Sequence, residues 1–229
     1  MLYKNKIYDN NDPNVPAAGA ASQGPVGTGV SIEGRNDTVM DNVIKDNGAW
    51  GVSYQPYPDT ETPPANVVKA GKACRAGSPN FSLLGVNIAC LYDDWGGRTI
   101  GNTFTNDGFF GNPTNGDMAQ ATFTPDHAIN CYAGNRDTDG TLTSSPASMQ
   151  TTNTDCGQIA TTPTTNYSFV FEIICDSEAF GPGFGCSATD HYARETKVVM
   201  HKLPSHLTSM KNACAGVPKN PWCTAPKKT

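Results

Sequence analysis

Residues 29–52 read GVSIEGRNDTVMDNVIKDNGAWGV and residues 89–112 read ACLYDDWGGRTIGNTFTNDGFFGN, so the second stretch repeats the first 60 residues later. Several positions correspond directly: Met40 with Ile100, Asn42 with Asn102, Ile44 with Phe104, Gly48 with Gly108, Trp50 with Phe110 and Gly51 with Gly111. A shorter copy opens the chain, where Asn5, Ile7 and Asn10 take the places of Asn42, Ile44 and Asn47. Self-similarity at a fixed spacing indicates a repeat architecture.

The shared core of the copies is a strand pattern followed by a turn. Its apolar positions alternate with period two, which indicates a strand with one buried face. Asn-Gly and Asp-Gly pairs follow, and both residue types tolerate the positive φ of tight turns. Residues 29–32 (GVSI) also recur as residues 51–54 (GVSY), 22 residues later. Short strands at this spacing, with no helical pattern between them, predict an all-β solenoid built from coils of that length.

These features resemble the right-handed parallel β-helix of pectate-lyase-like and related envelope proteins. In that family an inward asparagine stacks from coil to coil, and the resemblance implies such a ladder for Asn5, Asn42 and Asn102. Four further stretches resemble secreted bacterial β-helix repeat proteins, mostly of unknown function: residues 93–96, 108–117, 130–135 and 220–223. The resemblance covers most of the chain but implies no established activity. The alternative is an antiparallel protein whose Asn-Gly pairs mark ordinary hairpin loops.

The composition suits an extended protein of low charge. The chain has 229 residues, of which 37% are hydrophobic and 16% are charged, and its formal net charge is −5. A solenoid buries only a narrow axial core, so a low hydrophobic content is expected of it. The acidic balance argues against a nucleic-acid partner, which favours a basic face. No apolar run reaches the ~20 residues that a membrane-spanning helix needs.

Eight cysteines indicate an oxidising compartment, and hence a secreted or envelope-associated protein. Eight cysteines allow on the order of a hundred connectivities, of which local pairing is the simplest: Cys74–Cys90, Cys131–Cys156, Cys175–Cys186 and Cys214–Cys223. The competing hypothesis is a zinc site, which the lack of any CxxC spacing disfavours, and we expect no cofactor. Met1 aligns with Thr38 in the middle of a coil, so we expect that further coils and a signal peptide originally preceded it.

The sequence predicts two regions. Residues 1–135 contain the β-helix coils, with a long Pro-rich loop insertion at residues 55–89. Residues 136–229 form a largely irregular extension that packs on the solenoid and is pinned to it by disulfides. Within this extension the apolar run YSFVFEIIC, at residues 167–175, predicts a buried strand.

Insertions in a solenoid often form its binding surface. The insertion at residues 55–89 and the loop at residues 111–127 leave adjacent coils, so we expect them to flank one groove. Flat aromatic rings stack on sugar rings, and carboxylates or amides bind sugar hydroxyls, which suggests these binding residues: Trp95, Tyr57, Phe109 and Asp117. The alternative is that aromatic rings fill the core, as we expect for Trp50, Phe110 and Tyr92, the last of which aligns with Ile32.

Asp93 and Asp94, with Arg98 nearby, form the tightest ionisable cluster. In lyases of the pectate-lyase-like family that this chain resembles, carboxylates hold Ca²⁺ and an Arg or Lys acts as base. The resemblance therefore makes these three residues catalytic candidates. Asp93 and Asp94 are then weak calcium candidates, since Ca²⁺ prefers several oxygen ligands. A glycoside hydrolase would need two carboxylates about 5–9 Å apart, which two of Asp93, Asp94, Asp117 and Asp126 could supply. The simpler alternative is turn capping with a surface ion pair.

The sequence therefore favours a non-catalytic, secreted or envelope-associated protein that binds or presents to a polysaccharide or envelope glycan. One alternative is a polysaccharide lyase or glycoside hydrolase whose main catalytic coils precede this chain. The other is a structural or adhesive surface scaffold without a small ligand. Exposed aromatic rings in one groove would favour binding, whereas converging carboxylates beside a base would favour an enzyme.

Overall fold

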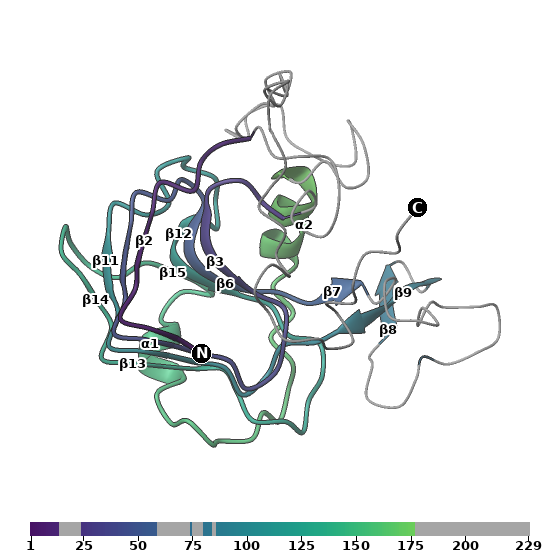
Figure 1. The fold of residues 1–229 in the computed structure, drawn as a ribbon. Helices are drawn as coiled ribbons and strands as arrows, with labels where there is room; N and C mark the ends of the chain where they lie inside the picture. Colours follow the sequence, from purple (N-terminus) through teal and green to yellow (C-terminus); the bar gives the residue numbers. More distant parts are fainter. Residues whose placement is uncertain (14–23, 59–73, 75–79, 84–85, 177–229) are drawn as a thin grey trace, which may run out of the picture. The chain divides into compact units, whose positions relative to one another are not determined.

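The structure is a computed structural model, and it describes residues 1–13, 24–58, 74, 80–83 and 86–176 (Figure 1). The chain divides into two compact units, Met1–Thr196 and Lys197–Thr229, of which the second lies outside the described residues. The described part consists mostly of short strands in parallel sheets, with only two helices. The predicted fold class is therefore confirmed at the level of a β protein with parallel strands.

Twelve of the strands form three four-stranded parallel sheets. The first sheet contains, in spatial order, β1 (Leu2–Tyr3), β4 (Thr38–Met40), β10 (Arg98–Ile100) and β13 (Cys131–Ala133). The second contains β2 (Lys6–Tyr8), β5 (Val43–Lys45), β11 (Thr103–Thr105) and β14 (Arg136–Asp137). The third contains β3 (Thr28–Ile32), β6 (Trp50–Tyr54), β12 (Gly116–Gln120) and β15 (Ser144–Ser145).

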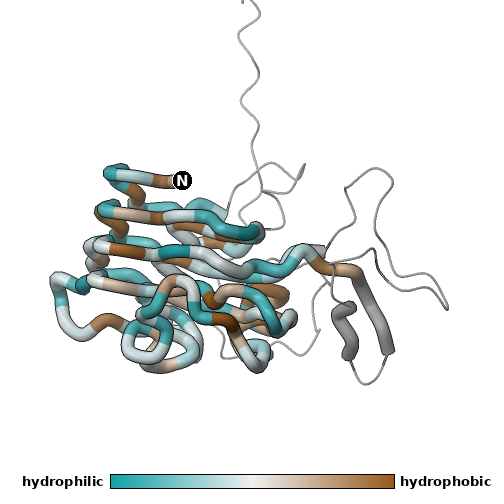
Figure 2. The backbone as a smooth tube through the Cα atoms, turned by 90° about the horizontal axis from the view of Figure 1, so that it is seen from below, coloured by the Kyte–Doolittle hydropathy of each residue, from teal (hydrophilic) through white to brown (hydrophobic). Residues whose placement is uncertain are grey.

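The chain visits the three sheets in the same order four times. We call each visit a pass: β1–β3, β4–β6, β10–β12 and β13–β15. Figure 2 shows the tube lying in successive layers, with the N-terminus in the outermost one. Passes that follow one another in the chain pair side by side. Equivalent residues therefore recur at fixed spacings in the sequence.

The register confirms most of the repeat that the sequence predicts. Ile100 pairs with Met40, and Phe104 pairs with Ile44, which itself pairs with Ile7. The shorter spacing is also confirmed, because Val30 pairs with Val52 across β3 and β6. Paired positions carry similar side chains because each one contacts the same layer of the neighbouring passes.

The predicted alignment is wrong after Gly108. Trp50 pairs with Gly116 rather than with Phe110, so the third pass contains six more residues than the second at this corner (116 − 50 = 66, against 60). The extra residues form the loop in which Phe110 lies partly buried, and its ring would touch a Cβ placed at Gly48. Phe110 therefore packs at the corner, while Trp50 is fully buried as predicted.

The predicted core position of Tyr92 is also wrong. Ile32 pairs with Tyr54, whereas Tyr92 pairs with Tyr57 and leaves 38% of its surface exposed. Tyr92 ends a separate antiparallel sheet, which contains β7 (Tyr57–Pro58), β9 (Val86–Tyr92) and β8 (Asn80–Leu83). The antiparallel pairing of β9 extends beyond the insertion to Tyr92, so the start of the second copy matches the repeat pattern without joining the parallel stack.

The apolar residues of the four passes form one buried cluster: Val30, Ile32, Val39, Ile44, Val52, Tyr54, Phe104, Met118, Tyr132 and Met149. Met149 reaches this cluster from the short helix α1 (Met149–Thr152). Burial of each large apolar side chain stabilises the fold by about 1.5–3 kcal/mol, so the cluster is the main apolar contribution in this part of the protein.

Rows of buried amides cross the passes beside this cluster. In one row each side-chain amide donates to the side-chain oxygen of the next residue: Asn5 to Asn42 (3.1 Å), Asn42 to Asn102 (2.9 Å) and Asn102 to Asn135 (3.0 Å). A second row runs from Asn10 to Asn47 (2.9 Å) and from Asn47 to Asp107 (2.8 Å). These bonds satisfy polar groups at the corners that the stacked strands would otherwise leave unpaired.

Residues 167–175 form a helix, so the predicted strand is wrong. The helix is α2 (Tyr167–Asp176), and Asn166 begins it by accepting a hydrogen bond from the Phe169 backbone N–H (3.3 Å). Phe169 packs edge-on to Trp50 at 5.1 Å between ring centroids, and Glu172 accepts from the Thr114 N–H (3.1 Å). A short apolar run does not by itself distinguish a buried strand from a helix. Asn166, a residue type that often caps the start of a helix, was the signal in the sequence that favoured a helix here.

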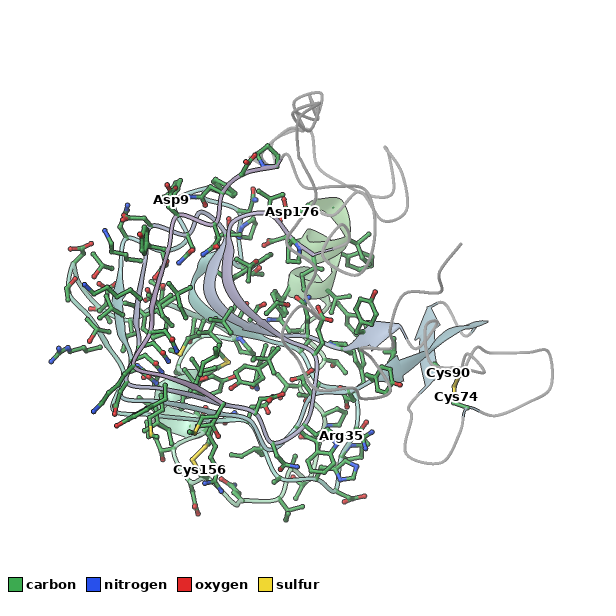
Figure 3. The ribbon with its side chains drawn as sticks, in the orientation of Figure 1. Asp9, Arg35, Cys74, Cys90, Cys156 and Asp176 are labelled. Atoms are coloured by element: carbon green, nitrogen blue, oxygen red, sulfur yellow. A yellow bond between two sulfur atoms is a disulfide. The ribbon has the colours of Figure 1, made fainter. Side chains whose placement is uncertain are left out.

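Two of the four expected disulfides are present, Cys74–Cys90 and Cys131–Cys156 (Figure 3). Cys175 is disulfide-bonded as well. Its expected partner Cys186, and both members of the expected pair Cys214–Cys223, lie outside the described residues. The second of the two disulfides joins β13 to the irregular chain after α1.

Candidate functional site

Asp93 and Asp94 lie at a corner of the third pass and are almost entirely buried, with 1% and 0% of their surface exposed. The Asp93 carboxylate accepts backbone hydrogen bonds from Phe123 (3.1 Å) and Thr124 (2.7 Å). These bonds hold the segment after β12 against the corner. The observed geometry is that of a buried carboxylate that caps a neighbouring backbone segment.

Asp94 is buried beside Asp93 and has only one side-chain partner. Its Oδ2 accepts from the Asn130 side-chain amide (2.7 Å), while its Oδ1 has no hydrogen-bond partner among the described residues. Burial, followed by the nearby negative charge of Asp93, raises the pKa of Asp94 well above its usual range. Asp94 is therefore a buried acid that favours its neutral form, behind the side chain of Asn130.

Arg98 is not brought together with these carboxylates. Its side chain is exposed on β10, and the one ion pair within the described part of the chain joins Lys45 to Asp46 (2.9 Å). Across the described residues no group of three or more His, Cys, Asp or Glu side chains has a geometry that could hold a metal ion. The three catalytic candidates thus divide into two buried acids and one exposed cation.

Trp95 lies between two other side chains. Its ring stacks on His127 with 4.4 Å between centroids and an interplanar angle of 11°, and the Arg35 guanidinium lies 5.2 Å from its centre. Arg35, labelled in Figure 3, forms a parallel bridge with Trp95 from the second pass, whereas His127 comes from the fourth. Because the two neighbours come from opposite sides of the stack, the ring faces are covered and the edge of the ring remains.

A pocket of about 240 Å³ lies next to Trp95. Its walls come from two segments, the chain between Gln120 and Asn130 and the chain between Asn153 and Thr164. Trp95 and His127 lie at one side of it. The pocket is thus formed where the last passes meet the irregular chain that follows α1.

The described residues that line the pocket are mainly neutral and polar. Four carry side-chain amides: Gln120, Asn130, Asn153 and Gln158. Five are threonines: Thr122, Thr124, Thr161, Thr162 and Thr164. Among the described lining residues there is no Asp, Glu, Lys or Arg. Amides and hydroxyls in this number can both donate to and accept from a polyhydroxyl ligand.

Gln120 is held in one orientation by the core. Its Oε1 accepts a hydrogen bond from the Tyr132 hydroxyl (2.7 Å), and its Nε2 donates to the Thr164 hydroxyl (3.3 Å). Tyr132 is fully buried, which raises its pKa well above its usual value, so the phenol keeps its proton. The phenol donor fixes the amide with its Nε2 on the Thr164 side, and one N–H of this group remains for a ligand.

The outer wall of the pocket is attached to the passes at several points. The Ile129 N–H donates to the Gln158 carbonyl (2.9 Å), and the Ala160 N–H donates to the His127 carbonyl (2.8 Å). The Cys131–Cys156 disulfide begins the same segment. Backbone pairing and a covalent bond together position a stretch of chain that has little regular secondary structure.

The other predicted binding residues do not line this pocket. Phe109 is 50% exposed at the corner loop and packs edge-on to Phe110, and Tyr57 lies on β7. Asp117 is buried in β12, where it accepts from the Thr143 N–H (2.7 Å) and hydroxyl (2.9 Å), and burial raises its pKa to about 6. Of the four predicted residues, only Trp95 lines the pocket.

The comparisons with protein-family models, with curated proteins and with solved structures found no match to this chain. Within the described residues, neither helix has the length and apolar character needed to cross a lipid bilayer. The functional conclusion therefore depends on the site itself.

Proposed function

We propose that the four passes form a right-handed parallel β-helix. The three sheets with matching strand order, the pairing of successive passes and the rows of asparagine amides support this architecture. The right hand is the hand that parallel strands prefer when the chain crosses from one to the next. The resemblance to pectate-lyase-like envelope proteins is part of the same proposal.

We infer that the protein is a secreted or envelope-associated, non-catalytic carbohydrate-binding protein. The observation that carries this inference is the pocket of about 240 Å³ next to Trp95, with its walls of amides and threonines. Disulfides support an oxidising environment. A sugar hydroxyl can both donate and accept, and it therefore suits a wall that offers both kinds of group.

The enzymatic alternative receives less support from the geometry. In a lyase or hydrolase the catalytic groups must reach the reacting atoms, whereas Asp93 and Asp94 are buried and Arg98 is exposed on β10. A scaffold without a ligand would not need a preformed polar pocket. Binding without catalysis is consequently the function that we favour.

A panel of neutral and acidic polysaccharides tests this proposal. The full chain is assayed for retention on each polymer, and for unsaturated and reducing-end products with and without Ca²⁺. We expect binding to at least one polymer and no product. Calcium-dependent product would instead establish an enzyme, and Asp93→Asn would then be the first variant to make.

A variant that fills the pocket locates the binding site. Thr162 lines the pocket and is exposed, so Thr162→Trp should block it without disturbing the core. Thr138→Trp places the same side chain at an exposed position outside the pocket and is the matched control. We expect loss of binding in the first variant only. Equal binding by both variants would show that the pocket is not the sugar site.

A further inference from the structure

The pocket has the size of a site for one sugar ring. Its volume of about 240 Å³ exceeds the ~150 Å³ cavity that accommodates a benzene ring. It lies just below the range of about 300–1,000 Å³ that is typical of pockets for drug-sized ligands. One pyranose, with its hydroxyl groups, is the unit of a polysaccharide that this space suits.

The charges around the pocket disfavour an anionic ligand. Behind the wall, the Asp93 carboxylate accepts from the Thr124 backbone, which places a negative charge next to a lining residue, whereas Asp94, which accepts from the Asn130 side chain, favours its neutral form. The described lining residues supply no Lys or Arg, and the Arg35 guanidinium lies against the ring of Trp95 instead. A carboxylate that loses its water without gaining a counter-charge is strongly destabilised.

We propose that this pocket selects a single uncharged sugar residue over a uronic acid, an inference that rests on the proposed carbohydrate binding. Gln120 is the side chain that recognises the hydroxyl groups of that sugar. Gln120 is 3% exposed and its amide is oriented by Tyr132. Its remaining Nε2 hydrogen can donate to a ligand hydroxyl oxygen. A site built to hydrogen-bond a hydroxyl discriminates strongly, because an unsuitable ligand leaves buried groups unpaired.

Matched pairs of methyl glycosides test the selectivity. Each neutral hexoside is titrated beside its uronate, which differs only at carbon 6, and affinities are measured by NMR at pH 8 on the full chain. We expect at least one neutral hexoside to bind roughly tenfold or more tightly than its uronate. Equal or tighter binding of the uronates would overturn the selectivity and leave sugar binding intact. Binding of neither set, together with no binding to any polysaccharide, would overturn the proposed function as well.

Two variants test the roles of the residues. Gln120→Glu keeps the acceptor for Tyr132 and removes the Nε2 donor, so it should weaken neutral-sugar binding roughly tenfold. Thr161→Lys adds a cation at an exposed lining position and should narrow the preference against uronates. Phe109→Ala, outside the pocket, is the matched control and should change neither. Thermal melting checks folding, and a folded Gln120→Glu protein with unchanged affinity would overturn the role of Gln120.

Discussion

In the stacked passes, core residues have counterparts one pass away, whereas residues 153–164, which form one wall of the pocket, lie outside this repeat. Ile44 pairs with Ile7 on one side and with Phe104 on the other. Residues 153–164 instead pair irregularly with residues 122–129 and are held by Cys131–Cys156. The repeated passes therefore stabilise the protein, whereas the chain outside the repeat forms the site that we propose for ligand binding.

Truncating the repeated core should have the largest effect. Phe104 is fully buried in the cluster formed by the four passes, so Phe104→Ala should reduce the free energy of unfolding by about 3–5 kcal/mol. Chemical denaturation measures this loss. Phe109→Ala, at a half-exposed loop position, is the control and should cost much less. Equal losses would mean that the passes do not share one core.

Removing the covalent tie of the wall should come next. The double variant Cys131→Ala/Cys156→Ala should lower stability by about 2–4 kcal/mol, and it should weaken sugar binding because the segment after Cys156 forms the wall. The corresponding variant of Cys74–Cys90 is the control, since neither cysteine lines the pocket. If binding survives the first variant unchanged in the folded protein, backbone pairing alone positions the wall.

Substitutions at interior and edge positions of the amide row should lower the free energy of unfolding by different amounts, both smaller than the loss expected for Phe104→Ala. Asn102 is buried and exchanges hydrogen bonds with Asn42 and Asn135, whereas Asn5 is exposed at the first pass. We expect Asn102→Ala to cost about 1–3 kcal/mol, since it leaves buried groups unpaired, and Asn5→Ala to cost less than half of that. Denaturant titration of the two variants compares them directly. Equal costs would contradict a cooperative row.

The end of the second amide row should produce a pH dependence. Burial raises the pKa of Asp107 from 3.8 to about 7, and its Oδ2 has no hydrogen-bond partner among the described residues. Because the folded state holds this proton more tightly than the unfolded state, the free energy of unfolding should fall as pH rises from about 4 to 7. Burial raises the pKa of Asp117 and Asp176 in the same direction, to about 6 and about 8.

Asp107→Asn isolates this contribution. It keeps the acceptor for Asn47 and removes the titratable group, so it should raise the melting temperature at pH 8.5 by a few degrees and leave it nearly unchanged at pH 4. Thermal melts of the variant and the parent at both pH values measure the difference. A variant that is destabilised at pH 8.5 would show that the Asp107 charge is favourable in the folded state.

The sequence predicted the stacked passes better than it predicted the wall of the pocket. The register at Met40–Ile100 and Val30–Val52 was predictable because similar side chains recur where passes contact each other. The alignment was wrong at Phe110, which lies in the longer corner loop of the third pass, and at Tyr92, which pairs with Tyr57 in the antiparallel sheet. Both residues match the pattern without sharing its neighbours.

The pocket was mostly beyond prediction because its residues converge only in space. Trp95 was identified from its apolar ring at a position where the other copy has Arg35, and the structure does place it at the pocket. Gln120 is the last residue of β12 and Asn130 directly precedes β13, and their role depends on contacts with Tyr132 and Asp94 that no spacing reveals. The density of Thr, Asn and Gln between residues 120 and 164 was the available signal.

A map of amide chemical-shift changes, recorded as a neutral sugar from the panel is added to the protein, would locate the binding site. Our account predicts that the largest changes occur at residues 120–130 and 153–164, and that Asn42 and Asn102 in the amide row stay unchanged. Changes centred on Tyr57 or Phe109, or none at any sugar concentration, would contradict it.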